Sequence, residues 1–400
     1  MWDFRIKPDV SGRGMDNSIT VENWLQAPNN RNSFQIVQTL FPTIRIRRGQ
    51  GSVSNFGTAP MDLASLTCTT SCGDACTIGE MLDTRFVDAF LVVKNGSLVF
   101  ERYFNGMSND SHHLLNSVTK SVIGMLTGIV VGMGRLDPAD RVTKYLPELA
   151  DTAFAETSVR HALDMSAAVA YNEDYANPDA DFWRETAVLG WRPSLAGPDS
   201  PKTLFDFIKR LHGKAQQDGA KYCYRTVLTN LIGMVLERAT GRRLAELLET
   251  ELWAKLGTEH DATIVADRSG FPYVGAGMNA SARDLARFGQ MIVQRGFFNG
   301  SQIVPASWID DTLQPNGEAM SAFAQSDYGP ALPGGQYRNQ CWGIDPSRGI
   351  LMAVGIYGQF IYMNVPKAIT IVQFSSQPQP ADVPMFLDVL AAMGAVADAL

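Results

Sequence analysis

Segments with a β-strand pattern lie near both ends of this chain, and a long run of helical patterns separates them. Near the start, F-V-D-A-F-L-V-V-K and S-L-V-F-E-R-Y-F flank Asn95-Gly96, a dipeptide typical of a two-residue type I′ hairpin turn. From Gly349 the pattern returns as I-L-M-A-V-G-I-Y, F-I-Y-M-N and A-I-T-I-V-Q-F. Because strands need partners, we expect both groups to form one antiparallel sheet that a helical insertion interrupts.

This arrangement predicts an α/β (α+β) fold in which an antiparallel sheet flanked by helices is joined to an all-helical lobe. The expected regions are an N-terminal wrapping segment, an α/β lobe in two parts and a mainly helical lobe: residues 1–80, residues 81–134 with 290–400, and residues 135–289. The wrapping segment contains a short helix near 33–40, and an apolar helix near 383–400 closes the chain. Active sites commonly lie in a cleft between such lobes.

Composition excludes several classes of partner. Apolar residues make up 45% of the chain and charged residues 19%, which is typical of a globular protein. The net charge of -7 contains no block of like charge, so neither nucleic acid nor a membrane surface is an expected partner. The N-terminal sequence M-W-D-F-R-I-K-P lacks an apolar signal region, which favours a cytoplasmic location. The oligomeric state, a homodimer included, is left open.

The five cysteines favour neither a disulfide framework nor a metal site. Cys68, Cys72 and Cys76 recur every four residues, as metal ligands can. However, a fourth ligand is missing and no histidine is near, so small residues in a loop are the preferred interpretation. We expect no metal and no cofactor.

The sequence Ser117-Val118-Thr119-Lys120 is the only S-x-x-K in the chain. It begins the most apolar segment, which is too short to span a bilayer and predicts a buried helix with Asn116 as its N-cap. Residues three apart share a helix face, and burial favours a neutral lysine that can take the serine proton. The alternative is that Ser117 caps the helix and Lys120 extends to water.

Three glycines follow at four-residue spacing on the face that carries Lys120: Gly124, Gly128 and Gly132. Because they lack side chains, we expect another element to pack closely against this face.

A second candidate group lies in K-Y-C-Y-R-T-V-L-T-N, just before a long amphipathic pattern. Tyr224 and Thr226 would place a phenol and a hydrogen-bonding hydroxyl at the mouth of the cleft. A phenol near a lysine can be held anionic and relay protons to a leaving group. Tyr222 is the competing choice, and for either tyrosine the alternative is a core aromatic residue. Cys223 between them is interpreted as a packing residue.

The loop A-Y-N-E-D-Y-A-N-P-D-A-D-F-W is acidic and aromatic. Such a run is more often a solvated loop. If it instead lines the cleft, Tyr171 could donate to a leaving amide nitrogen, and the carboxylates could attract an amine-bearing substrate. The five histidines are scattered along the chain, so no Ser-His-Asp triad is assigned.

Many ordered motifs resemble the serine β-lactamase, penicillin-binding protein and esterase superfamily, and within it most closely the 6-aminohexanoate-dimer (nylon-oligomer) hydrolases. The resemblance extends from about residue 23 to the C-terminus. The motifs that carry it are W-L-Q-A-P-N-N-R, D-A-F-L-V-V, L-L-N-S-V-T-K-S, G-R-L-D-P-A, Y-N-E-D-Y, L-W-A-K-L, D-A-T-I, A-R-D-L-A-R and G-I-Y-G-Q.

The resemblance implies a β-lactamase/transpeptidase-like fold with Ser117 as acylated nucleophile and Lys120 as its proton acceptor. A tyrosine from a Y-x-N or Y-x-S element would be the second acid or base, and counting back from V-L-E-R-A-T-G places it at Tyr224. The third position of that element is Thr226 here, which departs from the pattern.

The third element of β-lactamases, K-T-G, corresponds to the strand at 353–356, where Gly355 is the only matching residue. The missing lysine argues against binding of a penicillin carboxylate. The superfamily's oxyanion hole would consist of the N–H groups of Ser117 and Ile356.

These observations predict a serine hydrolase that cleaves small esters or amides, such as linear ω-amino-acid oligomers, through an acyl-enzyme at Ser117. A β-lactamase or DD-peptidase is the second reading, disfavoured by the missing K-T-G. A non-catalytic binding protein of the same fold is the third.

Overall fold

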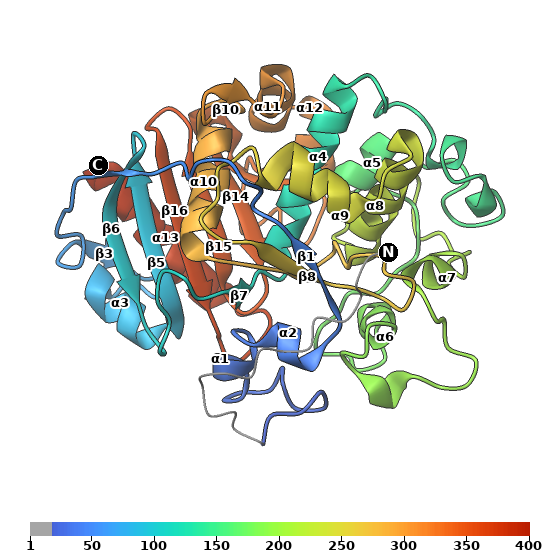
Figure 1. Cartoon of the computed structure of the whole chain (residues 1–400), viewed down its shortest axis with the longest axis horizontal. Helices are drawn as coiled ribbons and strands as arrows, with labels where there is room; N and C mark the ends of the chain where they lie inside the picture. Colours follow the sequence, from blue (N-terminus) through green and yellow to red (C-terminus); the bar gives the residue numbers. More distant parts are fainter. Residues whose placement is uncertain (1–17) are drawn as a thin grey trace.

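The computed structural model describes residues 18–400. Its largest element is an eight-stranded sheet (Figure 1). The strands, in the order in which they lie side by side, are β12 (Gln336–Arg338), β13 (Cys341–Asp345), β14 (Ile350–Gly355), β15 (Gln359–Asn364), β16 (Ile369–Ser375), β5 (Val87–Lys94), β6 (Ser97–Tyr103) and β2 (Gly57–Thr58). Every neighbouring pair is antiparallel except β2 and β6.

The sheet joins the two ends of the sequence, as predicted. β16 pairs with β5 from Ile369↔Lys94 to Ser375↔Val87, so C-terminal and N-terminal strands are direct neighbours. The hairpin of β5 and β6 turns at Asn95 and Gly96, whose φ angles of 49° and 75° are those of a type I′ turn. The expected α/β fold with an antiparallel sheet flanked by helices is confirmed.

Helices cover the sheet. The helix α10 (Ala282–Val293) crosses β5, β15 and β16, and Gly289 allows close approach because a Cβ there would lie 2.4 Å from Thr370 Cγ2. The C-terminal helix α13 (Val383–Ala399), near the predicted position, packs against a small hairpin of β3 (Thr67–Thr69) and β4 (Ala75–Thr77). The other helices of this part are α3 (Ile78–Thr84), α11 (Ala306–Leu313), α12 (Gly317–Ala324) and the 3₁₀ turn η5 (Pro346–Arg348).

The remaining helices gather on the other side of the molecule (Figure 1). They are α4 (Val118–Gly132), η1 (Val142–Lys144), η2 (Pro147–Leu149), α5 (Val159–Leu163), α6 (Asp181–Ala187), η3 (Pro193–Leu195), α7 (Leu204–Ile208), α8 (Thr226–Thr240), α9 (Leu244–Leu247) and the π-helical η4 (Leu248–Trp253). Within the region 135–289 that was expected to be mainly helical, the segment R-V-T-K-Y-L-P-E-L forms only the short 3₁₀ turns η1 and η2.

A second, four-stranded sheet was not predicted. Its strands lie in the order β1 (Thr43–Ile46), β8 (Ala262–Val265), β9 (Met278–Ala280) and β7 (His113–Leu114). Two further sheets are small hairpins: β3 (Thr67–Thr69) pairs with β4 (Ala75–Thr77), and β10 (Phe297–Phe298) pairs with β11 (Ser301–Gln302). Strands of two to four residues are too short to show a period-2 pattern. The sheet fixes the chain entering α4, because β7 pairs with β9 and Leu115 N–H donates to Met278 O.

The N-terminal region to residue 80 contains α1 (Asn30–Ser33) and α2 (Val37–Leu40) where one short helix was expected. Predictions that rest on residues 1–17 lie outside the described residues. The division into lobes stays a prediction, although α10 packs on the large sheet across the expected boundary at 289/290.

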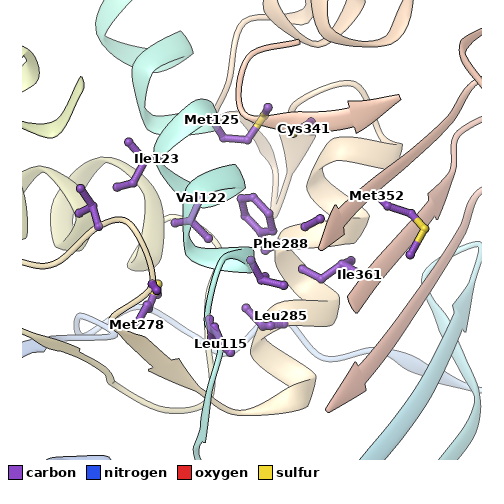
Figure 2. Packing of buried hydrophobic residues seen from close by; sticks show 14 of the residues in the cluster. Leu115, Val122, Ile123, Met125, Met278, Leu285, Phe288, Cys341, Met352 and Ile361 are labelled. Atoms are coloured by element: carbon purple, nitrogen blue, oxygen red, sulfur yellow. The ribbon is translucent and has the colours of Figure 1, made fainter. Parts of the chain in front are cut away.

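The core between the large sheet and α4 is apolar. Figure 2 shows Val122 of α4 beside Phe288 of α10, with Ile361 of β15 beyond them, and Met125 of α4 beside Cys341 of β13. All five are fully buried. Burial of such side chains contributes about 1.5–3 kcal/mol each, which holds α4 rigidly against the sheet.

The glycine face of α4 is in close contact with other segments, as predicted. A Cβ on Gly124 would lie 2.0 Å from Asn339 O, and one on Gly128 would lie 2.3 Å from Trp308 Cδ1. Gly132 meets Pro305 in the same way. These residues therefore have to be glycines for the chain between 305 and 339 to pack here.

No helix within residues 18–400 is both long and apolar enough to cross a membrane. In the same range, no three side chains of His, Cys, Asp or Glu gather as metal ligands would. Cys68 and Cys76 face each other across β3 and β4 with their sulfur atoms 3.4 Å apart, and Cys72 is exposed at the turn between them.

Alanine substitution of two helical glycines should change the stability of the protein in opposite directions, because one glycine is in close contact with another segment and the other is not. Gly124→Ala should destabilise the protein by about 3 kcal/mol, because the backbone carbonyl of Asn339 cannot move away from the new Cβ. Gly394→Ala in α13, where nothing lies within 4 Å of the new Cβ, should stabilise by about 0.5–1 kcal/mol. Urea unfolding of both variants measures this. An unchanged free energy of unfolding for Gly124→Ala would contradict the close contact.

Candidate active site

Ser117 lies at the junction between the four-stranded sheet and α4. β7 ends at Leu114, and α4 begins at Val118. The residue is 6% exposed, so only its outer surface is accessible. Its side chain makes no capping hydrogen bond to the helix, and its Oγ instead accepts from Lys120 Nζ at 2.7 Å. The serine hydroxyl is thus held for chemistry and not for helix capping.

The amine of Lys120 is buried and has three hydrogen-bond acceptors. The residue is 1% exposed, and Nζ donates to Ser117 Oγ, to Thr226 Oγ1 at 2.9 Å and to Gly275 O at 2.7 Å. Loss of solvent lowers the pKa of this lysine to about 8, against the opposing charges of Glu173 and Glu185. The alternative of a capping serine with a lysine that extends to water is therefore wrong.

Tyr224 lies over the same amine. Lys120 Nζ is 4.9 Å from the centroid of its ring, and its hydroxyl shares a hydrogen bond with Ser117. Burial and the charge of Glu173 raise the pKa of this phenol well above its usual value, although the Ser117 bond acts in the opposite direction. The direction of this shift favours the neutral phenol over the phenolate. A neutral phenol here is a proton donor.

Tyr222, the competing tyrosine, belongs to the core. It is 1% exposed and packs against Phe323, Tyr337 and Trp342. Within residues 18–400 its hydroxyl has no hydrogen-bond partner, and no hydrogen bond joins it to Ser117 or Lys120.

Thr226, expected to face the substrate, instead connects the lysine to an acid. It is fully buried as the first residue of α8, where its Oγ1 accepts from Lys120 and donates to Glu173 Oε1 at 2.6 Å. The Thr226 N–H also donates to Glu173. An asparagine or serine is therefore not needed at this position for a hydrogen bond to Lys120.

The acidic and aromatic loop is not a solvated loop. Residues 171, 173 and 175 turn inward, while 172, 174 and 176 are exposed. Tyr171 does not reach the nucleophile: its hydroxyl donates to Glu185, and among the described residues no hydrogen bond joins it to Ser117, Lys120 or Tyr224. Tyr175 is the tyrosine of this loop that joins the network around Lys120, because its hydroxyl donates to Glu173 Oε1 at 2.8 Å and Glu173 is bonded to Thr226.

The end of β14 lies directly against the nucleophile. A Cβ on Gly355 would be 2.7 Å from Leu115 O and 3.1 Å from Ser117 N, so only glycine allows this approach. Within residues 18–400, the N–H groups of Ser117 and Ile356 donate no hydrogen bond of their own. Both N–H groups are free to bind an oxyanion.

Asn116 connects these two segments. Its Nδ2 donates to Ile356 O at 3.1 Å, and its φ of +46° is in the left-handed region that asparagine tolerates. The prediction of Asn116 as helix N-cap is wrong, because a residue in this conformation with its amide on β14 cannot bond the first turn of α4. It instead fixes Ile356 relative to Ser117.

Several residues that contact this network were not predicted: Glu173, Tyr175, Glu185, Asn230 and Gly275. The inward residues of the loop could have been found from the period-2 spacing of Tyr171, Glu173 and Tyr175. Glu185 follows Phe182 by three residues, a spacing that places an acid on the apolar face of α6. Gly275 has no such signal, because its role belongs to a backbone carbonyl.

Comparisons with known proteins agree with this geometry. The Beta-lactamase family matches residues 80–392. The 6-aminohexanoate-dimer hydrolase of Paenarthrobacter ureafaciens is 34% identical over 361 residues, which are 90% of this chain and 89% of that protein.

Solved structures give the same result. A protein of Bacillus anthracis, provisionally described as a 6-aminohexanoate-dimer hydrolase, has a TM-score of 0.87 at 27% identity and covers 97% of this chain and 98% of its own. A hydrolase with promiscuous acyltransferase activity shares the fold, with a TM-score of 0.60 at 15% identity over 78% of this chain and 95% of its own. The predicted β-lactamase/transpeptidase-like fold and the resemblance to these enzymes are confirmed. The chain belongs to the beta-lactamase family and is a serine hydrolase related to the 6-aminohexanoate-dimer hydrolases.

Proposed function

We propose that the protein hydrolyses small esters or amides through an acyl-enzyme at Ser117, with the S-x-x-K lysine as base. The observation that carries this proposal is the 2.7 Å contact between the buried Lys120 Nζ and Ser117 Oγ. An amine that loses its proton near pH 8 can accept one from the serine. The binding-protein alternative leaves this placement of the amine unexplained.

In the proposed reaction, Ser117 Oγ attacks the substrate carbonyl while the neutral amine of Lys120 takes the hydroxyl proton. The N–H groups of Ser117 and Ile356 bind the oxyanion that forms. The phenol of Tyr224 donates its proton to the leaving amine or alkoxide, and Lys120 returns a proton to Tyr224. A water molecule then attacks the acyl-enzyme by the same steps in reverse, which releases the acid and frees Ser117.

The substrate proposed is a small linear amide or a short-chain ester. The printed name of the relative that is 34% identical specifies a 6-aminohexanoate dimer, and an amide of this kind carries an ammonium group. The acidic loop that holds Glu173 beside Tyr224 supports attraction of such a cation. The strand end Val354-Gly355-Ile356 supplies no cationic side chain for a penicillin carboxylate, which disfavours a β-lactamase or DD-peptidase.

Ser117→Ala should lower turnover of a p-nitrophenyl acetate-to-octanoate series by about 10³-fold or more, because the nucleophile is removed. Hydrolysis of the linear 6-aminohexanoate dimer is measured by the free amine that it releases. This measurement decides between an amidase and an esterase. Ser111→Ala, a nearby serine that bonds only Ser108, serves as the matched control. Full activity of Ser117→Ala would refute the assignment of the nucleophile.

The acylation rate should rise with pH and level off above about 8. The pKa of Lys120 is lowered from 10.5 to about 8, and only the form without the proton can act as base, so the rate falls roughly tenfold per pH unit below the midpoint. Stopped-flow release of p-nitrophenol between pH 6 and 10 measures this. Lys120→Arg, which stays charged throughout, should be inactive at every pH. A midpoint near 10 would contradict the effect of burial.

Asn116→Gly should lower kcat about tenfold or more with little change in KM, because Ile356 is no longer fixed relative to Ser117. Glycine accepts the positive φ, so the change isolates the loss of the amide. Asn105→Gly is the matched control: Asn105 has a φ of 51° and also donates to a backbone carbonyl, that of Arg31. Equal kinetic effects of both variants would show a general loss of stability instead.

A further inference from the structure

A buried chain of hydrogen bonds continues behind Lys120, away from Ser117. The carbonyl of Gly275 accepts from Lys120, and the N–H of the same residue donates to Asn230 Oδ1 at 3.0 Å. Asn230 Nδ2 in turn donates to Glu185 Oε1, and the Tyr171 hydroxyl donates to Glu185 Oε2. The chain thus links Glu185 of α6 to the Lys120 amine through Asn230 of α8 and the two peptide groups that flank the Cα of Gly275.

Glu185 is the unusual member of this chain. It is fully buried, and within residues 18–400 no arginine, lysine or histidine forms an ion pair with it. A buried carboxylate without a counter-ion is costly, and burial accordingly raises the pKa of Glu185 to about 8. Both of its oxygens nevertheless have donors, so the site is built to hold a carboxyl group in one orientation.

We propose that Glu185 is a positioning residue whose charge controls the protonation of Lys120, while its hydrogen bonds fix the Gly275 carbonyl that holds the amine. This inference rests on the proposed function of Lys120 as base. Without its proton, Glu185 favours the ammonium form of the lysine. When Glu185 carries its proton, it is neutral and no longer favours the ammonium, so the burial of Lys120 favours the neutral amine.

The groups that surround Glu185 support this coupling. Tyr171 donates to it, Tyr273 lies within reach of its charge, and Glu173 and Lys120 are the charged groups that interact with it. Glu173 acts on the lysine too, but it also accepts hydrogen bonds from Tyr175 and from Thr226, which is itself a direct partner of Lys120. Glu185 is bonded to Lys120 only through Asn230 and Gly275, so its effect can be tested without changing a direct hydrogen-bond partner of the amine.

Glu185→Gln isolates the charge, because glutamine keeps an acceptor for Asn230 and a partner for Tyr171. The midpoint of the acylation pH profile should fall by about half a pH unit or more, since a carboxylate that favours the ammonium form is gone. The plateau at high pH should stay within about threefold of wild type, with KM unchanged. Glu185→Leu, which also breaks the chain to Gly275, should lower the plateau about tenfold or more. Glu156→Gln, at an exposed carboxylate paired with Arg141, is the control.

A second readout does not depend on turnover. The ¹³Cε shift of Lys120, assigned from Lys120→Arg, reports the titration of the amine directly in wild type and Glu185→Gln. If wild type shows no ester or amide hydrolysis, the proposed function fails, yet the shift still tests the coupling. Equal midpoints in both proteins would overturn the inference.

Tyr171→Phe provides a variant that leaves the carboxyl group in place. The Tyr171 hydroxyl lowers the pKa of Glu185, so its removal should keep that acid protonated to higher pH. The Lys120 midpoint should then move downward, in the same direction as in Glu185→Gln. Thermal unfolding checks that each variant folds. An upward shift in Tyr171→Phe would overturn the inference even if Glu185→Gln does not fold.

Discussion

The burial of one amine is the constraint on which the site depends. Removing the lysine ammonium from water is unfavourable by several kcal/mol unless its donors are satisfied. Lys120 therefore needs acceptors from three separate parts of the chain, namely its own helix, the start of α8 and the loop between β8 and β9. The nucleophile is one of these acceptors, so the same contact that makes burial tolerable also prepares the serine.

The rest of the fold fixes the positions of these parts relative to one another. The apolar core fixes α4 against the large sheet, and the four-stranded sheet fixes the residues that enter it (Figures 1 and 2). Gly355 lets β14 come within contact distance of Ser117, and Asn116 sets the position of Ile356. The N–H groups of Ser117 and Ile356, the proposed oxyanion hole, therefore come from two segments that only tertiary packing brings together.

Much of this arrangement could be predicted from local patterns, and the failures have physical causes. The hairpin at Asn95-Gly96 and the buried helix after Ser117 follow from turn chemistry and apolar periodicity. The left-handed Asn116 could not be predicted, because Ser, Thr, Asn and Asp before a helix usually act as caps. The position of Tyr171 away from Ser117 could not be predicted, because Tyr171 and Tyr175 lie on the same face of an extended segment. Only tertiary packing decides that Tyr171 bonds Glu185 and that Tyr175 bonds Glu173.

Two acids near one lysine, the buried Glu185 and the half-buried Glu173, have a clear role once the proposed reaction is considered. Burial alone would favour the neutral amine strongly, which suits the resting enzyme. In the proposed reaction, however, the lysine becomes an ammonium as Ser117 attacks, and a purely apolar site would oppose that step. Glu173 and Glu185 favour the charged form, and their opposition to burial brings the pKa of the amine to about 8. The base is thus weak enough to lose its proton near neutral pH and strong enough to take the proton of a serine.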